Sequence, residues 1–183
     1  MRRRLAGILC TVVAVVALLG TLGCKSEADG VKDIVSKQLD AYTAFALGEE
    51  PKEGEPQPVF DDDDTAQVLS GYGIDVDEYH RHLYKNFSYK IDDATVDGDS
   101  ATVSVDVTNA SLDAALSAAS ADYSAWQETD EAQSAYADMG HQALLEKLMQ
   151  FLYQHLDANE SPETTTVDIH LSKADNGAWQ ITR

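Results

Sequence analysis

The strict alternation of residues 101–107 is the feature that most constrains how this chain can fold. Alanine and three valines occupy every second position, and threonine, serine and aspartate stand between them. The dipeptide Asp97-Gly98, just before this run, is typical of a tight turn, and residues 87–96 read as a preceding strand. These signals predict a β-hairpin whose second strand is apolar on one face only, as in an antiparallel sheet covered on one side.

A second hairpin is predicted at the C-terminal end of the chain. Val167, Ile169 and Leu171 alternate with polar residues, and the turn dipeptide Asn176-Gly177 follows them. Residues 179–182 then supply the returning strand.

Helical spacing dominates the rest of the chain. Apolar residues recur at three- and four-residue intervals within residues 31–47, 65–85 and 111–157. Gly48 ends the first helix, and the second segment is expected to break near residues 71–73.

Two more boundaries follow from capping residues and from segment length. The later half of the 65–85 segment begins after Asp75 or Asp77, since either is a good N-cap. The 111–157 segment is too long for one helix, and we expect breaks within 127–130 and near Gly140.

Residues 49–64 are predicted to form a flexible acidic loop. Pro51, Pro56 and Pro58 lie among charges, so regular structure cannot persist there. The acidic run Asp61–Asp64 at its end suggests a calcium site. Consecutive acids on an extended chain point in opposite directions, however, so a solvated loop that caps the next helix fits better.

The N-terminal residues 1–23 have the layout of a secretory signal. Met1-Arg2-Arg3-Arg4 precedes an uncharged, mostly apolar run over 5–22, and Gly23 and Cys24 follow. The segment Leu19-Gly20-Thr21-Leu22-Gly23-Cys24 resembles a bacterial lipoprotein signal, with Thr21 standing where leucine is usual.

That resemblance implies cleavage before Cys24, a lipid on its sulfur, and a tether over residues 24–30. The protein would then sit on the extracytoplasmic face of the cell membrane. The alternative is an uncleaved membrane helix, since about 18 apolar residues can just span a bilayer. Either way the arginine-rich end stays in the cytoplasm.

Charge and cysteine content limit the possible partners. Residues 24–183 carry ten basic and 32 acidic side chains, a net charge of −22, which excludes a nucleic-acid role and favours cationic peptides, amines or divalent ions. Plain solubility is the simpler interpretation of this charge. The two cysteines are Cys10, in the discarded segment, and Cys24, so no disulfide is expected in the folded part.

The predicted order of elements is two helices, a hairpin, several helices and a second hairpin. This order predicts one α+β domain over residues 31–183, in which a curved antiparallel sheet of two hairpins packs against helices. This order is similar to the nuclear transport factor 2-like, or cystatin-like, architecture. The similarity rests on Phe87–Ile91, Val96–Val103 and Gly177–Ile181. The chain also resembles small lipoproteins of Gram-positive bacteria whose domain has no assigned function. The long helical insert between the hairpins departs from the simplest version of the fold.

A sheet closing on helices favours an apolar pocket, which would take a small apolar or cationic ligand or a peptide. His80 is expected in the core or at the pocket rim and His82 at the surface, since their side chains diverge on a helix and do not form a metal pair. The candidate lining residues are Tyr79, His80, Phe87, Tyr89, Trp126, Phe151 and Trp179.

We therefore expect non-catalytic binding or an envelope-associated role, without cofactor or metal. Two alternatives remain open. An isomerase- or hydratase-like enzyme would need an acid or histidine beside a tyrosine hydroxyl in a roomy pocket, with Asp106, or His155 with Tyr153, as candidates. A protein-interaction module would instead show an exposed apolar patch or an open sheet edge and no deep cavity.

Overall fold

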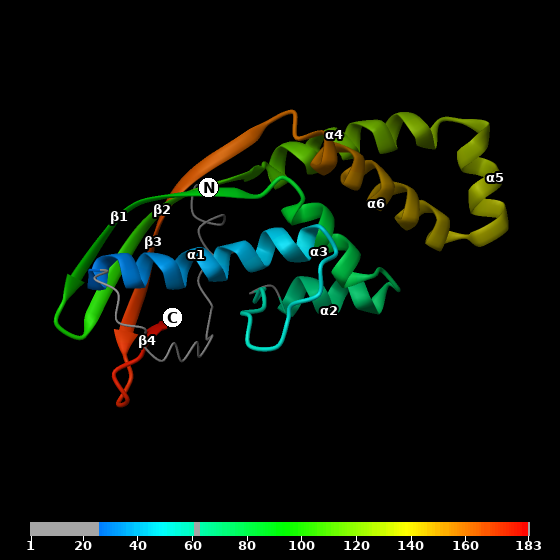
Figure 1. The fold of residues 1–183 in the computed structure, drawn as a ribbon. Coiled ribbons are helices and arrows are strands. Elements are labelled where there is room, and N and C mark those ends of the chain that lie inside the picture. The colour runs from blue at the N-terminus through cyan, green and yellow to red at the C-terminus, as the bar shows by residue number, and fades with distance from the viewer. Residues whose placement is uncertain (1–25, 61–62, 183) are drawn as a thin grey trace. The chain divides into compact units, whose positions relative to one another are not determined.

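The computed structural model describes residues 26–60 and 63–182. Its four strands form one antiparallel sheet in the order β1-β2-β3-β4, which confirms the predicted α+β class (Figure 1). The elements are α1 (Glu27–Ala46), α2 (Asp63–Gly71), α3 (Val76–Tyr84), β1 (Ser88–Asp97), β2 (Ser100–Ala110), α4 (Leu112–Gln127), α5 (Asp130–Met139), α6 (His141–Ala158), β3 (Pro162–Lys173) and β4 (Trp179–Ile181).

The described residues group into two compact units. The sheet unit comprises the residues up to 63 together with 87–108 and 164–182, and the helical unit comprises 64–86 and 109–163. The chain thus enters the helical unit twice and leaves it twice. A single domain over 31–183 stays a prediction.

Helix α1 begins four residues before the predicted start at residue 31. Ser26 and Asp29 form a capping box: the Ser26 hydroxyl accepts the Asp29 amide at 3.2 Å, and the Asp29 carboxylate accepts the Ser26 amide at 3.2 Å. Such a box stabilises the first turn of a helix. Residues 27–30, predicted as part of the tether, therefore belong to the helix, which ends before Gly48 at a φ of 75°.

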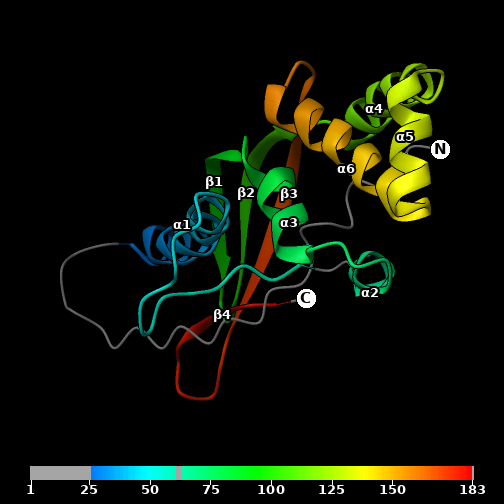
Figure 2. The ribbon, with the colours of Figure 1, turned by 90° about the vertical axis from the view of Figure 1, so that its right-hand side faces the viewer.

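The core of the sheet unit lies between α1 and one face of the sheet. Helix α1 packs against β1 and β4, and Figure 2 shows it lying along one side of the strands. The predicted apolar side of β2 faces this core, since Val103 and Val105 are fully buried. The fully buried or nearly fully buried α1 side chains are Val31, Val35, Leu39 and Tyr42.

The other face of the sheet is polar, and its side chains bond from strand to strand. Thr108 and Thr164 share a hydrogen bond at 2.7 Å, and the Thr166 hydroxyl donates to the Asp106 carboxylate at 2.6 Å. Thr102 and His170 approach to 3.1 Å. The alternation read from the sequence thus separates a packed face from a hydrogen-bonded one.

The proline-rich segment 49–60 has no helix or strand, as predicted, but it is held against α1. The Tyr42 hydroxyl donates to the Val59 carbonyl at 2.7 Å, and the Gln38 amide donates to the Gln57 carbonyl at 2.8 Å. The Phe60 ring also lies 5.8 Å from that of Tyr42. Residues 61 and 62 of the acidic run lie outside the described residues.

The helical unit confirms the predicted helix breaks. Helix α3 starts after Asp75, whose carboxylate accepts the Glu78 amide at 3.1 Å, so Asp75 is the cap. Helices α4 and α5 are capped by Ser111 and Thr129, and Gly140 separates α5 from α6 at a φ of 66°. Positive φ favours glycine, which explains why the chain turns there.

Helices α4 and α6 pack side by side, and α5 joins their far ends (Figure 1). Small residues on α4 allow the close approach, since Ala115 and Ala119 are buried. Leu152 and Leu156 of α6 are also buried, and His155 Nε2 of α6 lies 2.8 Å from the Asp122 carboxylate of α4. Helix α3 also contacts α6, and a cleft lies between these two helices.

Candidate functional site

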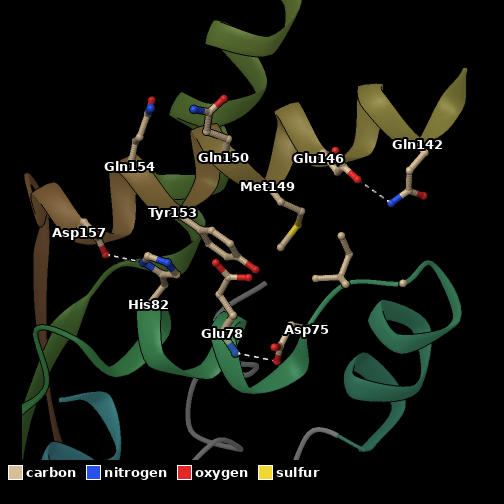
Figure 3. Close-up of a pocket in the computed structure, with 12 residues that line it drawn as sticks. Asp75, Glu78, His82, Gln142, Glu146, Met149, Gln150, Tyr153, Gln154 and Asp157 are labelled. Atoms are coloured by element: carbon tan, nitrogen blue, oxygen red, sulfur yellow. Dashed lines mark hydrogen bonds and ion pairs between the residues drawn. The ribbon is translucent and has the colours of Figure 1, made fainter. Parts of the chain in front are cut away.

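An open cleft of about 550 Å³ lies between α3, the turn that precedes it, and α6 (Figure 3). All of its lining residues belong to the helical unit. They are Gly73, Ile74, Asp75, Glu78, His82, Gln142, Glu146, Met149, Gln150, Tyr153, Gln154 and Asp157. The volume falls within the range of known small-molecule sites.

One face of α6 forms a long wall of the cleft. Its lining residues recur at intervals of three, four and seven, which is the spacing of one side of an α-helix. Leu152 and Leu156 of the same helix do not line the cleft and are buried. The helix is therefore amphipathic, and its polar side is turned to the cleft.

The cleft is acidic. Four lining side chains are carboxylates, three are glutamine amides, and no lysine or arginine is among them. Asp75 and Glu78 come from the α3 side, and Glu146 comes from α6, where its carboxylate accepts the Gln142 amide at 3.1 Å. Asp75, Glu78 and Glu146 are exposed, and carboxylates of one sign attract a cation to the space between them.

Asp157 is the exception, because its charge is compensated. It accepts His82 Nδ1 at 2.8 Å and Lys85 Nζ at 2.6 Å. Burial alone would raise the pKa of Asp157, but the hydrogen bonds from His82 and Lys85 outweigh it and hold the pKa below its ordinary value of 3.8. The negative charge of Asp157 at this end of the cleft is therefore compensated by its partners.

Tyr153 stands in the middle of the cleft wall. Its ring stacks on His82 with centroids 4.1 Å apart and an interplanar angle of 11°. Burial, followed by the negative charges of Glu78 and Asp75, raises the pKa of Tyr153 to about 12. Its hydroxyl oxygen is inaccessible to water and has no hydrogen-bond partner among the described residues.

Figure 3 shows how these groups face one another. The Tyr153 and Met149 side chains point from α6 toward α3, and the Glu78 carboxylate rises toward them from the opposite side. The Met149 side chain is almost fully buried, so it forms an apolar floor. The cleft therefore combines acidic rims with an aromatic and aliphatic centre.

A second hollow, of about 430 Å³, lies between α1 and the docked segment 49–60 in the sheet unit. It is lined by both signs of charge, among them Lys37, Lys52 and Asp40. Nearby, the Tyr89 hydroxyl donates to the Asp40 carboxylate at 2.6 Å. Asp40 is exposed, so this acid–tyrosine pair lacks the burial that an acid–base site requires.

The seven predicted pocket residues divide between the two units. Phe87, Tyr89 and Trp179 lie in the sheet unit, and the other four lie in the helical unit: Tyr79, His80, Trp126 and Phe151. None of the seven lines either hollow. Tyr79, His80, Phe87 and Trp126 are buried and serve packing, and Lys147 Nζ lies 5.3 Å from the Phe151 ring centroid.

The histidine predictions are partly corrected. His80 is buried, as expected, but His82 is only partly exposed and lines the cleft instead of standing at the surface. His155 Nε2 lies 2.8 Å from Asp122, so its partner is on α4 and the suggested pairing with Tyr153 is not formed. Asp106 lies in the polar ladder of the sheet.

Among the described residues, no three or more histidine, cysteine or acidic side chains gather in a way that could hold a metal ion. Every helix in the same part of the chain is too short or too polar to cross a membrane. Cys24 and the predicted signal lie outside the described residues.

The cleft residues that the sequence interpretation missed left a periodic signal. Gln142, Glu146, Gln150 and Gln154 recur every four positions. On a helix whose other side is apolar, such a row marks a polar face. Nothing in that row, however, distinguishes a face that lines a cleft from one that faces bulk water.

No protein-family model and no curated protein matches the chain. Among solved structures, the chain is similar to a crystal structure described as a "putative lipoprotein (ycdA)" from Bacillus subtilis, with 16% sequence identity and a TM-score of 0.43. The similarity covers 85% of this chain and 55% of that one, so this chain spans about half the length of the protein it matches.

Proposed function

We propose that this chain is a membrane-anchored lipoprotein that binds a cationic ligand, without catalysis, in the cleft between α3 and α6. One observation carries the binding proposal: a cleft of about 550 Å³ that three uncompensated carboxylates line without any lysine or arginine. An amine entering it would exchange water for charge-assisted hydrogen bonds to Asp75, Glu78 or Glu146.

Lipid anchoring is proposed from the N-terminal sequence. Arginines, an apolar run and Gly23-Cys24 match the layout of a lipoprotein signal. With α1 starting at Glu27, the link between Cys24 and the first helix is short, so the folded part would lie close to the extracytoplasmic face. Its strong negative charge would keep it off anionic headgroups.

Anchoring is tested by the intact mass of the protein extracted from membranes. We expect a chain that starts at Cys24 and carries extra lipid mass, and a Cys24→Ser variant that is released or left unprocessed. A full-length chain without added mass, equally membrane-bound in both forms, would support the uncleaved helix instead.

Ligand binding is tested by calorimetry on the detergent-solubilised protein. Hexylamine, hexanol and hexanoate share an apolar tail and differ in charge. We expect binding of hexylamine only, weakening as salt is added, since screening acts on charged partners. Equal binding of all three would indicate an apolar pocket, and binding of none would leave the cleft without a ligand role.

An acid–base enzyme is the second candidate, and it rests on the pairing of His82 with Asp157 at the cleft wall. Lys85 shares the same carboxylate, and the Tyr153 hydroxyl lacks a hydrogen-bond partner among the described residues. Because the Asp157 carboxylate is shared between His82 and Lys85, and the Tyr153 hydroxyl is not hydrogen-bonded to this pair, these residues fit ligand binding better than acid–base catalysis.

The nuclear transport factor 2-like arrangement also remains a proposal. It is supported by one long helix, α1, along a four-stranded antiparallel sheet with strands in chain order. The helical segment 111–161 would then be an insert between β2 and β3. Replacing it by a short turn and measuring whether the remainder still unfolds cooperatively tests this proposal.

A further inference from the structure

Strand β3 has a free edge along part of its length. It pairs with β2 on one side, but on the other side only residues 171–173 pair with β4, which lies beside one end of β3 (Figure 1). The last described bond on that side is from the Thr182 amide to the His170 carbonyl, at 2.8 Å. Residues 164–168, here called the open segment, have a neighbouring strand on the β2 side only among the described residues.

The register decides which backbone groups of the open segment face outward. Side-chain contacts between β2 and β3 keep one register throughout it, so no bulge interrupts it. The Lys173 amide donates at 2.9 Å to the residue that precedes β2, whereas the His170 carbonyl faces β4. Because these directions alternate along an antiparallel strand, the N–H and C=O groups of Thr164, Thr166 and Asp168 point to the free side.

The opposite edge of the sheet, formed by β1, is protected. A register shift between Ile91 and Asp93 interrupts its pairing, the exposed Lys90 lies on it, and α1 packs against it. Bulges, lysines and covering helices keep edge strands from pairing with other chains. The open segment has no bulge, lysine or proline, and threonine and valine, which favour strands, fill four of its five positions.

An added strand would meet a different surface on each face of the sheet. On the polar face, Thr164, Thr166 and Asp168 are exposed. On the other face, Val167 is partly exposed and Thr165 is exposed, although the β2 valines on that face are buried. Alternate side chains of a strand point to opposite faces. The edge therefore fits a segment in which apolar residues alternate with polar ones.

Charge distinguishes a second copy of this chain from a different partner. Asp168 and the neighbouring Asp106 of β2 are acidic, and neither β2 nor residues 162–172 contain a lysine or arginine. A second copy would bring another strongly acidic chain to this edge and would be repelled. A lysine or arginine opposite Asp168 would instead form a cross-strand pair of opposite charge. The edge therefore favours a basic partner.

We propose that the open segment binds an extended, basic segment of another protein chain, which adds a strand to the sheet. The added strand runs antiparallel to β3, in line with β4, and forms main-chain hydrogen bonds with the outward-facing residues. One of its lysines or arginines pairs with Asp168, and an apolar side chain covers Val167. Main-chain bonds provide the affinity of such strand addition, and alternate side chains provide its specificity. The site lies within the sheet unit and is independent of the α3–α6 cleft.

Fluorescence anisotropy on the detergent-solubilised full chain tests binding, with the labelled peptide Lys-Val-Thr-Val-Thr as probe. In the antiparallel register its lysine lies opposite Asp168 and its last residue opposite Thr164. The control is the same peptide with N-methyl groups on the lysine and first threonine amides, which keeps the charge and the side chains. Because two main-chain hydrogen bonds are lost, we expect the control to bind at least about tenfold more weakly.

Amide hydrogen exchange measured by NMR gives a pattern that is specific to strand addition. In the free protein, the amides of Thr165 and Val167 bond to β2 and should exchange slowly, whereas those of Thr164, Thr166 and Asp168 should exchange fast. Bound peptide should slow the second set and leave the first nearly unchanged.

Variants of the chain test the backbone contact and the charge separately. Thr166→Pro removes an outward N–H and no bond to β2, and should weaken peptide binding about tenfold, while Thr166→Val keeps that N–H and should bind as the parent does. Asp168→Asn should weaken binding about threefold. Asp77→Asn, at an exposed position that lines neither this edge nor the cleft, should have no effect. Circular dichroism checks folding, and the N-methylated peptide tests the backbone contact without any variant.

Three results would overturn the proposal. The first is equal binding of the two peptides or unchanged exchange of the outward-facing amides. The second is equal weakening by Asp168→Asn and Asp77→Asn, which would reduce the effect to net charge. The third is a dimer in sedimentation whose outward-facing amides are protected without peptide, since a second copy would then occupy the edge.

Discussion

The sheet unit and the helical unit of this chain use their side chains differently. In the sheet unit, β-branched and aromatic side chains fill one face of the sheet, and hydroxyls and carboxylates on the other face bond to each other across strands. In the helical unit, alanines let α4 and α6 approach, and a polar helix face borders a cleft where the Tyr153 hydroxyl has no partner. The polar face of the sheet is therefore bonded from strand to strand, while the polar face of α6 borders open space.

The largest expected effect comes from emptying the core of either unit. Leu39→Ala in the sheet unit and Leu156→Ala in the helical unit each remove a side chain that is at most 1% exposed. We expect each to lower the free energy of unfolding by about 2–5 kcal/mol, and hydrogen exchange to accelerate mainly in the unit that carries the change.

Leu116→Ala is the matched control, since Leu116 is 42% exposed and should change stability by less than about 0.5 kcal/mol. If either core variant accelerated hydrogen exchange equally in both units, the two units would unfold together. That result would contradict the expectation that each unit has its own stability.

A smaller effect is expected where the proline-rich segment docks. Tyr42→Phe removes the hydroxyl that donates to the Val59 carbonyl at 2.7 Å. The carbonyl then loses its partner, so stability should fall by about 1–2 kcal/mol and protease cleavage within 49–60 should become faster. Tyr136→Phe, at an exposed position, should alter neither property.

Asp157→Asn tests the compensated end of the cleft. Because the pKa of Asp157 lies below 3.8 in the folded protein, its ionised form stabilises the fold at higher pH, and this contribution disappears as pH falls through the lowered pKa. The pair is partly exposed, so we expect a loss of less than about 1 kcal/mol at pH 7. Denaturant titrations should show the variant and the parent converging in acid; a constant difference down to pH 2 would contradict this account.

Tyr153→Phe should change the ionisation of the protein at high pH and should change its stability little at neutral pH. One of the eight tyrosines should titrate near pH 12 in ultraviolet difference spectra, and Tyr153→Phe should remove that component. The raised pKa means that folding stability from this group is complete below pH 10 and declines as pH rises from 10 toward 12. If the last tyrosine titrated near pH 10, neither the burial of Tyr153 nor the charges of Glu78 and Asp75 would raise its pKa, which would contradict this prediction.

Much of the fold could be predicted from local patterns. The alternation of residues 101–107 and the Asp97-Gly98 turn correspond to β1, β2 and their connection, and the breaks near residues 71–73, 127–130 and 140 lie where they were expected. Each depends on a few neighbouring residues. Helix α1 starts earlier than predicted because the capping box of Ser26 and Asp29 has the composition of a polar tether.

The candidate site could not be predicted in the same way. Aromatic residues were expected to line a pocket, yet Phe87 and Trp126 are buried in packing. The cleft arises because α3 meets α6, some 60 to 80 positions apart in the chain, and that meeting leaves no local sequence pattern.

The most direct test of the cleft as a cation site is the thermal unfolding midpoint with and without spermidine at constant ionic strength. A ligand at about 100 times its Kd stabilises the folded state by about 2.7 kcal/mol. We expect spermidine to raise the midpoint of the parent and of Asp77→Asn, and to leave the midpoint of the Glu78→Gln, Glu146→Gln double variant unchanged. An equal rise in all three proteins would contradict this expectation.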